Sequence, residues 1–309
     1  MLSRVANNLY WFGRYVQRAE NTARLINVRA NLLFDLPRAV DTGWAPLLQI
    51  MGAEESFSTR YTESSEVNSV RFLMLDAENP GSIASSLTSA REIMRTVRDS
   101  LPSEAWEKLN DLHLYVQERG EKSLTRSKRA EFLARVTDGV LLLHGLLDNN
   151  MSHDEGFHLL RIGTNLEQAD MTTRIIDVRS SSLIQTRTSE DLAPFQNIQW
   201  MSVLRSLTGY QMYRRHERAR VTGPNVLRFL LQNREFPRSV TFCLNMIAST
   251  LPHLPEQRAI ARALDRTRAL AHDANLDKLV ESGLHSLMDE IQIGLAHTHE
   301  ALHDAYFKV

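Results

Sequence analysis

Residues 12–28, FGRYVQRAENTARLINV, and residues 162–178, IGTNLEQADMTTRIIDV, are two versions of one segment, 150 positions apart. The residues that recur at the same places in both copies include Gly13 and Gly163, Ala19 and Ala169, Thr22 and Thr172, Arg24 and Arg174, and Val28 and Val178. Residues 72–87 then resemble residues 229–244 at a shift of 157. Between these segments lie two recurring pairs at a shift of 156, Trp44 with Trp200 and Leu48 with Leu204. Three collinear matches at nearly one offset predict an internal duplication.

The repeated segment has the period of an α-helix. Apolar residues recur at alternating intervals of three and four, at Leu9, Phe12, Val16, Ala19, Ala23 and Ile26. The chain contains no pair of β-branched runs joined by a hairpin turn. We therefore expect an all-α fold of roughly ten to twelve helices. It would be an internally duplicated helical bundle, with repeats at residues 1–151 and 152–309 packed as one compact unit about a pseudo-two-fold axis.

Prolines and capping residues predict where individual helices begin. Asn79 before Pro80 has the pattern of an N-cap followed by proline at the first helical position. Ser103 is placed to cap the next helix. The stretches 52–69 and 180–197 are predicted loops, the first because it is rich in Ser, Thr and Glu.

The composition limits the class of protein. The 309 residues include 36 Lys and Arg against 37 Asp and Glu, a net charge of -1, which gives no electrostatic support for binding nucleic acid or an anionic membrane. No apolar run approaches the roughly 20 residues of a membrane span. The N-terminal stretch has no uninterrupted apolar region and no small-residue cleavage site, so we expect no secretory signal. The single cysteine, Cys243, excludes an intrachain disulfide. We therefore expect a soluble, cytoplasmic protein that binds neither nucleic acid nor membrane.

Three common motifs are missing from the sequence: G-x-x-x-x-G-K-[ST], G-x-G-x-x-G and G-x-S-x-G. Their absence disfavours a nucleotide hydrolase, a dinucleotide enzyme and an α/β-hydrolase, and we expect no cofactor. Cys243 stands among apolar residues of a predicted helix, which favours a buried structural thiol over a nucleophile.

A polar stripe runs beside the apolar one on each repeated helix. Its positions are spaced by four, three, four and three residues and so share one face: Gly13, Gln17, Glu20, Arg24 and Asn27 in the first copy, and Gly163, Glu167, Asp170, Arg174 and Asp177 in the second. In each copy an acid precedes an arginine by four residues, the favourable order for an ion pair. In one interpretation the stripes lock the two helices together, and the glycines allow a close approach. In the other they line a shared cleft in which arginines face an anionic group.

The cleft interpretation names site residues. The candidates for acid–base chemistry are Glu20, Glu167 and Asp170. The candidates for binding a carboxylate or a phosphate are Arg14, Arg18, Arg24 and Arg174. Such a protein would be an enzyme whose site lies between the two repeats.

Residues 299–303, HEALH, match the zincin pattern H-E-x-x-H, in which two histidines one turn apart bind zinc and the glutamate acts as a base. His299, His303 and Glu300 are therefore candidate residues for a zinc hydrolase. Only six residues follow His303, which leaves almost no room for a third ligand downstream. We expect a solvated helix face at this place, and no metal.

Five segments carry a resemblance to a known family: LSRVANNLYWFGRYVQRAENTARLINV (2–28), NPGSI (79–83), SAREIMRTVR (89–98), IGTNLEQADMTTRIIDV (162–178) and EFPRSVTFC (235–243). They are similar to the bacterial Alpha-E family, an all-helical domain named for an acid-arginine motif. Members of that family sit beside, or are fused to, circularly permuted ATP-grasp proteins and transglutaminase-like proteins. The resemblance thus implies an accessory protein, not itself catalytic, that acts with a circularly permuted ATP-grasp ligase in ATP-dependent peptide or amide-bond formation.

The acid-arginine motif is divided between the two copies. Where the family would read Glu-Arg, this chain has Gln17-Arg18 in the first copy and Glu167-Gln168 in the second. A complete pair therefore requires Arg18 and Glu167 to meet across the pseudo-two-fold axis.

Overall fold

The computed structural model describes residues 1–35, 43–185, 193–217, 220–279 and 283–308. Over these ranges the chain forms helices and no strand, as expected for an all-α protein. The helices are α1 (Ser3–Asp35), α2 (Ala45–Ile50), α3 (Glu54–Ser58), α4 (Glu66–Met74), α5 (Ile83–Thr96), α6 (Ser103–Arg119), α7 (Arg126–Asn150), α8 (Glu155–Gln185), α9 (Ala193–Ser206), α10 (Tyr210–His216), α11 (Gly223–Gln232), α12 (Val240–Thr250), α13 (Arg258–Asp273), α14 (Leu276–Leu279) and α15 (Leu284–Leu302). A π-helical turn, His303–Phe307, follows α15. None of these helices combines the length and apolar character needed to cross a membrane.

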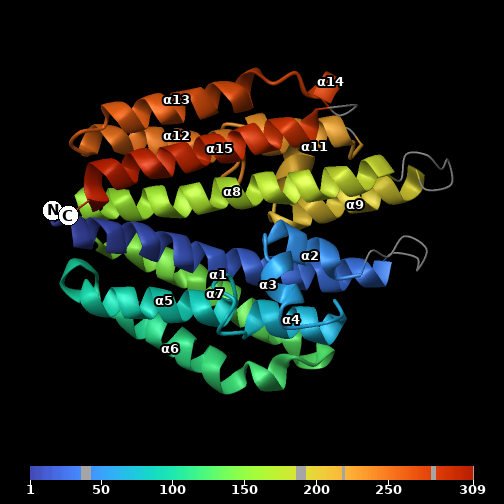
Figure 1. Cartoon of the computed structure of the whole chain (residues 1–309), viewed down its shortest axis with the longest axis horizontal. Helices are drawn as coiled ribbons and strands as arrows, with labels where there is room; N and C mark the ends of the chain where they lie inside the picture. The colour runs from blue at the N-terminus through green and yellow to red at the C-terminus, as the bar shows by residue number, and fades with distance from the viewer. Residues whose placement is uncertain (36–42, 186–192, 218–219, 280–282, 309) are drawn as a thin grey trace.

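The two longest helices, α1 and α8, run side by side through the middle of the molecule (Figure 1). On the α1 side, α5 and α7 pack against α1, and α6 packs against both of them. On the α8 side, α12 and α15 pack against α8, and α13 packs against both of them. The chain is therefore arranged as two groups of helices joined along the α1–α8 contact. The duplication itself stays a prediction.

The backbones of α1 and α8 approach each other closely at the two glycines of the polar stripes. A Cβ atom added to Gly13 would lie 2.3 Å from the carbonyl oxygen of Leu160, and one added to Gly163 would lie 2.1 Å from that of Tyr10. Real Cβ atoms do not approach other atoms so closely, so each helix places its backbone against the glycine of the other. The sequence interpretation that these glycines allow a close approach is confirmed.

Helix starts differ from the sequence prediction at two places. The helix after Pro80 begins at Ile83, because Ser82 is its N-cap and accepts a hydrogen bond from the Ser85 backbone N–H. Asn79 instead closes a turn, since its Oδ1 accepts from the N–H of Gly81. Ser103 is the first residue of α6 and makes no cap hydrogen bond.

The two predicted loops also contain more helix than expected. Residues 52–69 include α3 and the beginning of α4. In the stretch 180–197, α8 continues to Gln185 and α9 begins at Ala193, while the remainder lies outside the described residues.

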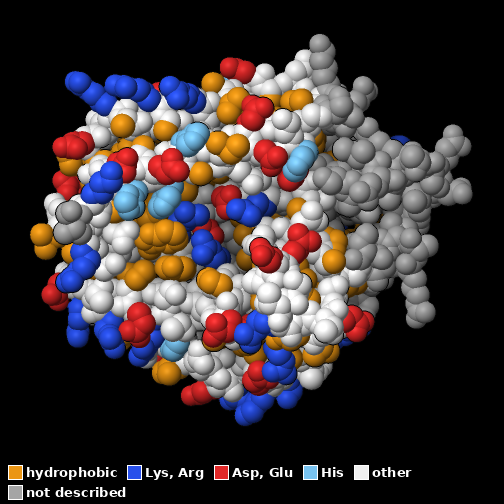
Figure 2. Space-filling model, viewed as in Figure 1, with side chains coloured by type: hydrophobic (Ala, Val, Ile, Leu, Met, Phe, Trp, Pro, Cys, Tyr) orange, Lys and Arg blue, Asp and Glu red, His pale blue; other side chains and the backbone are white. Residues whose placement is uncertain are grey.

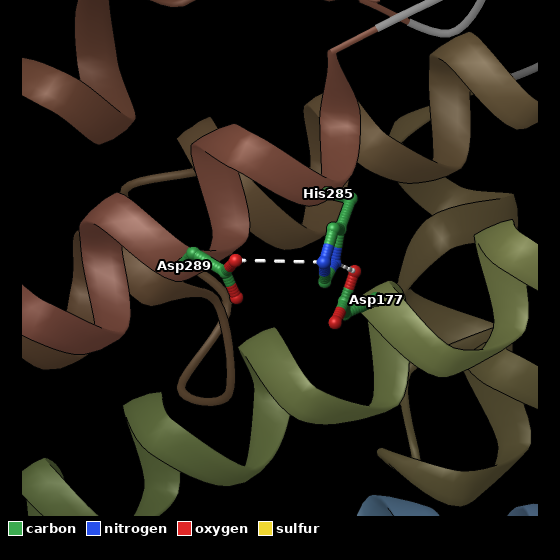
Figure 3. A group of neighbouring side chains, drawn as sticks. All are labelled: Asp177, His285 and Asp289. Atoms are coloured by element: carbon green, nitrogen blue, oxygen red, sulfur yellow. Dashed lines mark hydrogen bonds and ion pairs between the residues drawn. The ribbon is translucent and has the colours of Figure 1, made fainter.

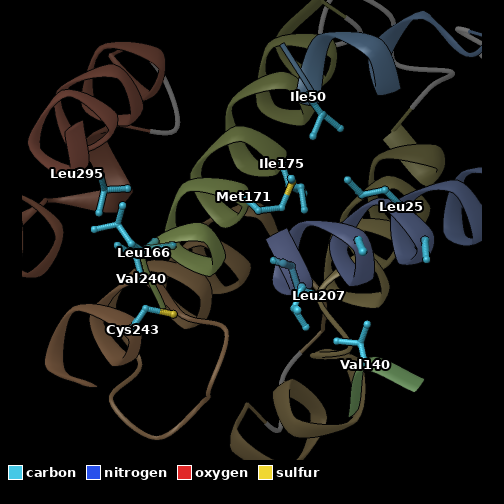
Figure 4. Packing of buried hydrophobic residues seen from close by; sticks show 14 of the residues in the cluster. Leu25, Ile50, Val140, Leu166, Met171, Ile175, Leu207, Val240, Cys243 and Leu295 are labelled. Carbon is cyan, nitrogen blue, oxygen red and sulfur yellow. The ribbon is translucent and has the colours of Figure 1, made fainter. Parts of the chain in front are cut away.

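One cluster of buried hydrophobic side chains runs through both groups of helices. Leu25 of α1 and Met171 and Ile175 of α8 belong to it, while Cys243 of α12 and Leu295 of α15 extend it on the α8 side (Figure 4). Burial raises the pKa of the Cys243 thiol to about 12. The thiol is structural, as the sequence predicts, because so little thiolate forms near neutral pH.

Candidate functional site

Arg18 of α1 and Glu167 of α8 meet across the helix contact. Arg18 donates two parallel hydrogen bonds, from Nε to Oε1 at 2.6 Å and from Nη2 to Oε2 at 2.9 Å. Arg14 donates from Nε to Glu167 Oε2 at 2.7 Å, and its guanidinium lies over the Trp11 ring. Burial would raise the pKa of Glu167, but the charges of Arg14 and Arg18 outweigh it and lower that pKa to about 2. The carboxylate is therefore ionised and held by two arginines of the other helix.

A second buried carboxylate, Glu20, lies on α1. Arg24 donates from Nε to Glu20 Oε1 at 2.7 Å, and Arg238, just before α12, donates from Nη2 to the same oxygen at 2.8 Å. Gln17 donates from Nε2 to Oε2 at 2.8 Å. Burial again opposes ionisation, yet the charges of Arg238 and Arg24 lower the pKa of Glu20 to about 2.

An amide contact lies beside the Arg18–Glu167 pair. Gln17 Nε2 donates to Gln168 Oε1 at 2.9 Å, and Arg238 Nη1 donates to the same oxygen at 2.8 Å. Each residue at positions 17 and 18 thus contacts a residue at positions 167 and 168. The acid-arginine pair is therefore complete only between the two helices, as Arg18 with Glu167. The remaining two motif positions, Gln17 and Gln168, join the helices through neutral amides.

The third acid, Asp170 of α8, lines a pocket that Glu167 also borders, and it differs from both other acids because one arginine alone donates to it among the described residues. The pocket has a volume of about 210 Å³. Its walls are α8, Arg18 of α1, the segment 50–56 and the turn 79–81. Asp170 Oδ2 accepts a hydrogen bond from Arg174 Nε at 2.9 Å. Figure 2 shows basic and acidic side chains gathered near the middle of this face, where α1 and α8 meet.

Four of the seven candidate residues line this pocket: Arg18, Glu167, Asp170 and Arg174. The other three, Arg14, Glu20 and Arg24, belong to the ion-pair network but do not line it. Both oxygens of Glu167 and both oxygens of Glu20 accept hydrogen bonds. Carboxylates held in this way are poor proton acceptors, because protonation would have to break a charged contact.

The sequence model of the Alpha-E family, described as a predicted alpha-helical domain with a conserved ER motif, matches residues 1–307. The chain belongs to the Alpha-E family. Uncharacterized proteins of Mycobacterium bovis and of Mycobacterium tuberculosis strain CDC 1551 are each 24% identical to it over 330 aligned residues. The alignment covers 97% of this chain and 36% of theirs, so the chain spans about a third of the length of the curated relatives it matches. No solved structure matches it.

One residue of the ion-pair network in this Alpha-E chain, Arg238, could not be identified from the sequence. It lies between two residues, Pro237 and Ser239, that match Pro80 and Ser82 at a shift of 157, so its own counterpart is Gly81. Because a glycine shows no side-chain pattern to match, this arginine gave no repeated signal. Its partnership with Glu20 depends on the packing of α12 against α8, which in turn packs against α1.

The HEALH segment of the Alpha-E chain places its two histidines in different surroundings. His299 Nδ1 and the Tyr10 hydroxyl share a hydrogen bond of 2.9 Å, and the two rings stack with centroids 5.4 Å apart. Burial lowers the pKa of His299. His303 is exposed and lies 3.6 Å from Asp304. His299 is therefore engaged with the aromatic residues of α1, while His303 lies on the solvated face.

Asp177, His285 and Asp289 form a cluster at the α8–α15 contact (Figure 3). Within the described part of the chain it is the one group of three His, Cys, Asp or Glu residues with ligand atoms within 4.8 Å of one another. The His285 ring lies between the two acids, with Nδ1 at 2.8 Å from Asp177 and Nε2 at 3.5 Å from Asp289. The hydrogen bond to Asp177 raises the pKa of His285. A protonated imidazole accounts for both contacts, because each ring nitrogen donates toward a different carboxylate.

Proposed function

We propose that this Alpha-E chain is an accessory helical protein, not itself catalytic, that acts with a circularly permuted ATP-grasp ligase in ATP-dependent peptide or amide-bond formation. The observation that carries the non-catalytic role is the state of the two buried carboxylates. Glu20 and Glu167 have pKa values of about 2, and arginines contact both. Such groups stabilise a helix contact and do not take up or release protons near neutral pH.

The comparison with relatives supports action beside another protein or domain. In the two mycobacterial relatives the matching region occupies 36% of the chain. The resemblance to the Alpha-E family supplies the class of partner, an ATP-grasp protein, with a transglutaminase-like protein as a second candidate.

Co-purification and ligase assays test this proposal. The chain is mixed with the circularly permuted ATP-grasp protein from the same genome, without nucleotide, with ATP and with ADP. We expect a complex on size-exclusion chromatography in at least one condition, and faster ADP release when the chain is present. Absence of both effects under all three conditions would overturn the accessory role.

A second candidate function is an enzyme acting on a carboxylate- or phosphate-bearing substrate at the inter-helix site. The pocket favours it, since Asp170 faces open space with Arg18 and Arg174 beside it. In that case Asp170→Asn would abolish turnover without loss of helicity. An Asp170→Asn chain that still supports full ligase activity would count against the enzyme and not against the accessory role.

A further inference from the structure

The two sides of the α1–α8 contact differ in the residue that each repeated threonine contacts. Thr22 of α1 donates from Oγ1 to the carbonyl oxygen of Gly81 at 3.3 Å, and Thr172 of α8 donates from Oγ1 to that of Arg238 at 2.9 Å. These threonines are 150 positions apart and their partners 157 positions apart, the offsets of the predicted duplication. Gly81 therefore stands beside α1 where Arg238 stands beside α8. One position has a long cationic side chain, and the other has none.

Because Gly81 has no side chain, the carboxylate of Asp170 has fewer hydrogen-bond partners than that of Glu20. Glu20 is contacted by Arg24, Arg238 and Gln17. Its counterpart Asp170 has Arg174 as the one hydrogen-bond partner of its side chain within the described residues. The space beside Gly81 is the pocket of about 210 Å³. Asp170 thus faces open space on the side where Glu20 meets a second cation.

The opposite wall of the pocket differs in charge as well. Gln168 offers its Oε1 to the Arg238 guanidinium at 2.8 Å. The residue 150 positions earlier is Arg18, which lines the pocket and presents a guanidinium where Gln168 presents an oxygen. A lone cation beside Asp170 would be repelled by Arg18 and Arg174, and a lone anion would be repelled by Asp170 and by Glu167, which also lines the pocket. A group with both charges offers an ammonium to Asp170 and a carboxylate to the arginines.

We propose that this pocket binds the zwitterionic end of a free α-amino acid. The ammonium takes the place of the missing guanidinium and donates to Asp170. The carboxylate accepts from Arg174 and from Nη1 of Arg18, since Nε and Nη2 of Arg18 already donate to Glu167. This inference goes beyond the accessory role and concerns the chain alone, so it can fail while the ATP-grasp partnership holds, and the reverse is also true.

Ligand screening of the isolated chain tests the charge requirement. The free proteinogenic L-amino acids are screened by thermal unfolding, and the best is measured by isothermal titration calorimetry. Its deaminated acid, its decarboxylated amine and inorganic phosphate are measured in parallel. We expect the amino acid to bind at least about tenfold more tightly than any of the three, because each lacks a charged hydrogen bond. No binding by any amino acid, or equal binding by the deaminated acid or phosphate, would overturn the proposal.

Filling the pocket is the sharper test. A Cβ at Gly81 would lie 3.3 Å from Asn79 Oδ1 and 3.6 Å from Met51 Cε, so a shift of a few tenths of an ångström by the Asn79 side chain would admit Gly81→Arg, whose guanidinium would then enter the pocket. Gly145→Arg, at an exposed position of α7 with no atom within 4 Å of a new Cβ, adds the same charge elsewhere. We expect Gly81→Arg to abolish amino-acid binding and Gly145→Arg to leave it unchanged.

A second variant keeps the proposal testable if Gly81→Arg does not fold. Asp170→Asn keeps the side-chain size but removes the charge, and we expect at least about a tenfold loss of affinity for the amino acid. Its affinity for the deaminated acid should not fall. A folded Gly81→Arg or Asp170→Asn chain that binds the amino acid as tightly as the unchanged protein would overturn the proposal.

Discussion

Arg18 and Glu167 form a bidentate ion pair between two helices that are 149 residues apart in sequence at this point. The contact supplies both members of the acid-arginine motif, one from each helix. Arg18 and Glu167 should therefore stabilise the α1–α8 contact as a coupled pair, so that the effect of replacing one depends on whether the other is present.

Removing the carboxylate should cost more than removing one arginine. Glu167→Ala leaves Arg14 and Arg18 buried without their shared partner, and we expect a loss of about 3 to 5 kcal/mol in the free energy of unfolding. Arg18→Ala should cost less, since Arg14 still holds Glu167. Urea denaturation of both single variants and the double variant gives the coupling energy. Arg95→Ala, at an exposed pair with Glu92, is the control and should change stability by less than about 1 kcal/mol. Equal effects of Glu167→Ala and Arg95→Ala would contradict a stabilising role for the motif.

The close approach of α1 and α8 at Gly13 and Gly163, here called the glycine crossing, predicts that replacing either glycine by alanine lowers the stability of the protein. Gly13→Ala and Gly163→Ala each drive a methyl group into a backbone carbonyl of the facing helix, and should destabilise the protein by about 1 to 3 kcal/mol or more. Gly145→Ala adds the same methyl group to an open helix surface and should stabilise by up to about 1 kcal/mol. Thermal and urea unfolding of the three variants measure this. If all three shifts had the same sign, the close approach would be wrong.

Stability should fall steeply in acid. Glu20 and Glu167 have folded pKa values of about 2 against an ordinary value of 4.5. Since both values are depressed by folding, the stabilisation is fully present above pH 4.5 and is lost as the pH falls toward 2. Each carboxylate contributes on the order of 3 kcal/mol at neutral pH. Urea denaturation at a series of pH values should show a smaller acid-induced loss for Glu167→Gln than for the unchanged protein. The same loss in both would show that Glu167 does not titrate as described.

Cys243 should react only when the protein unfolds. The thiol is fully buried, donates to the carbonyl oxygen of Pro237 at 3.4 Å and has its pKa raised to about 12 by burial. We expect negligible reaction with a thiol reagent near neutral pH in the native state, and full reaction in denaturant. Rapid labelling of the native protein, at a rate independent of denaturant, would contradict this placement.

How far the sequence predicts this structure depends on whether a feature leaves a repeated or periodic pattern in the chain. The helical class and the close approach at Gly13 and Gly163 could be predicted, because both follow from spacing along the chain. The Arg18–Glu167 contact could be anticipated only as a requirement of the divided motif. The first residues of helices were less predictable, since Asn79 and Ser82 are both good capping residues, and Ser82 caps the helix while Asn79 closes the turn before it.

Other contacts between residues far apart in the sequence were not predictable. Arg238 reaches Glu20 from a turn more than 200 residues away, and nothing in its neighbourhood indicates that target. The same is true of His285, which meets Asp177 only because α15 packs on α8. The pocket depends on the absence of a side chain at Gly81, and an absence has no periodic pattern.

The glycine crossing also limits how this protein can move. A slide of one helix along the other by a single turn, about 5.4 Å, would bring Leu9 or Gln17 to the place of Gly13 and force a side chain into a carbonyl. The α1–α8 contact is thus fixed in axial register. A ligand entering beside Asp170 meets a wall that cannot slide along the helix axis, and adjustment of shape on binding falls to the segment 50–56 and the turn 79–81.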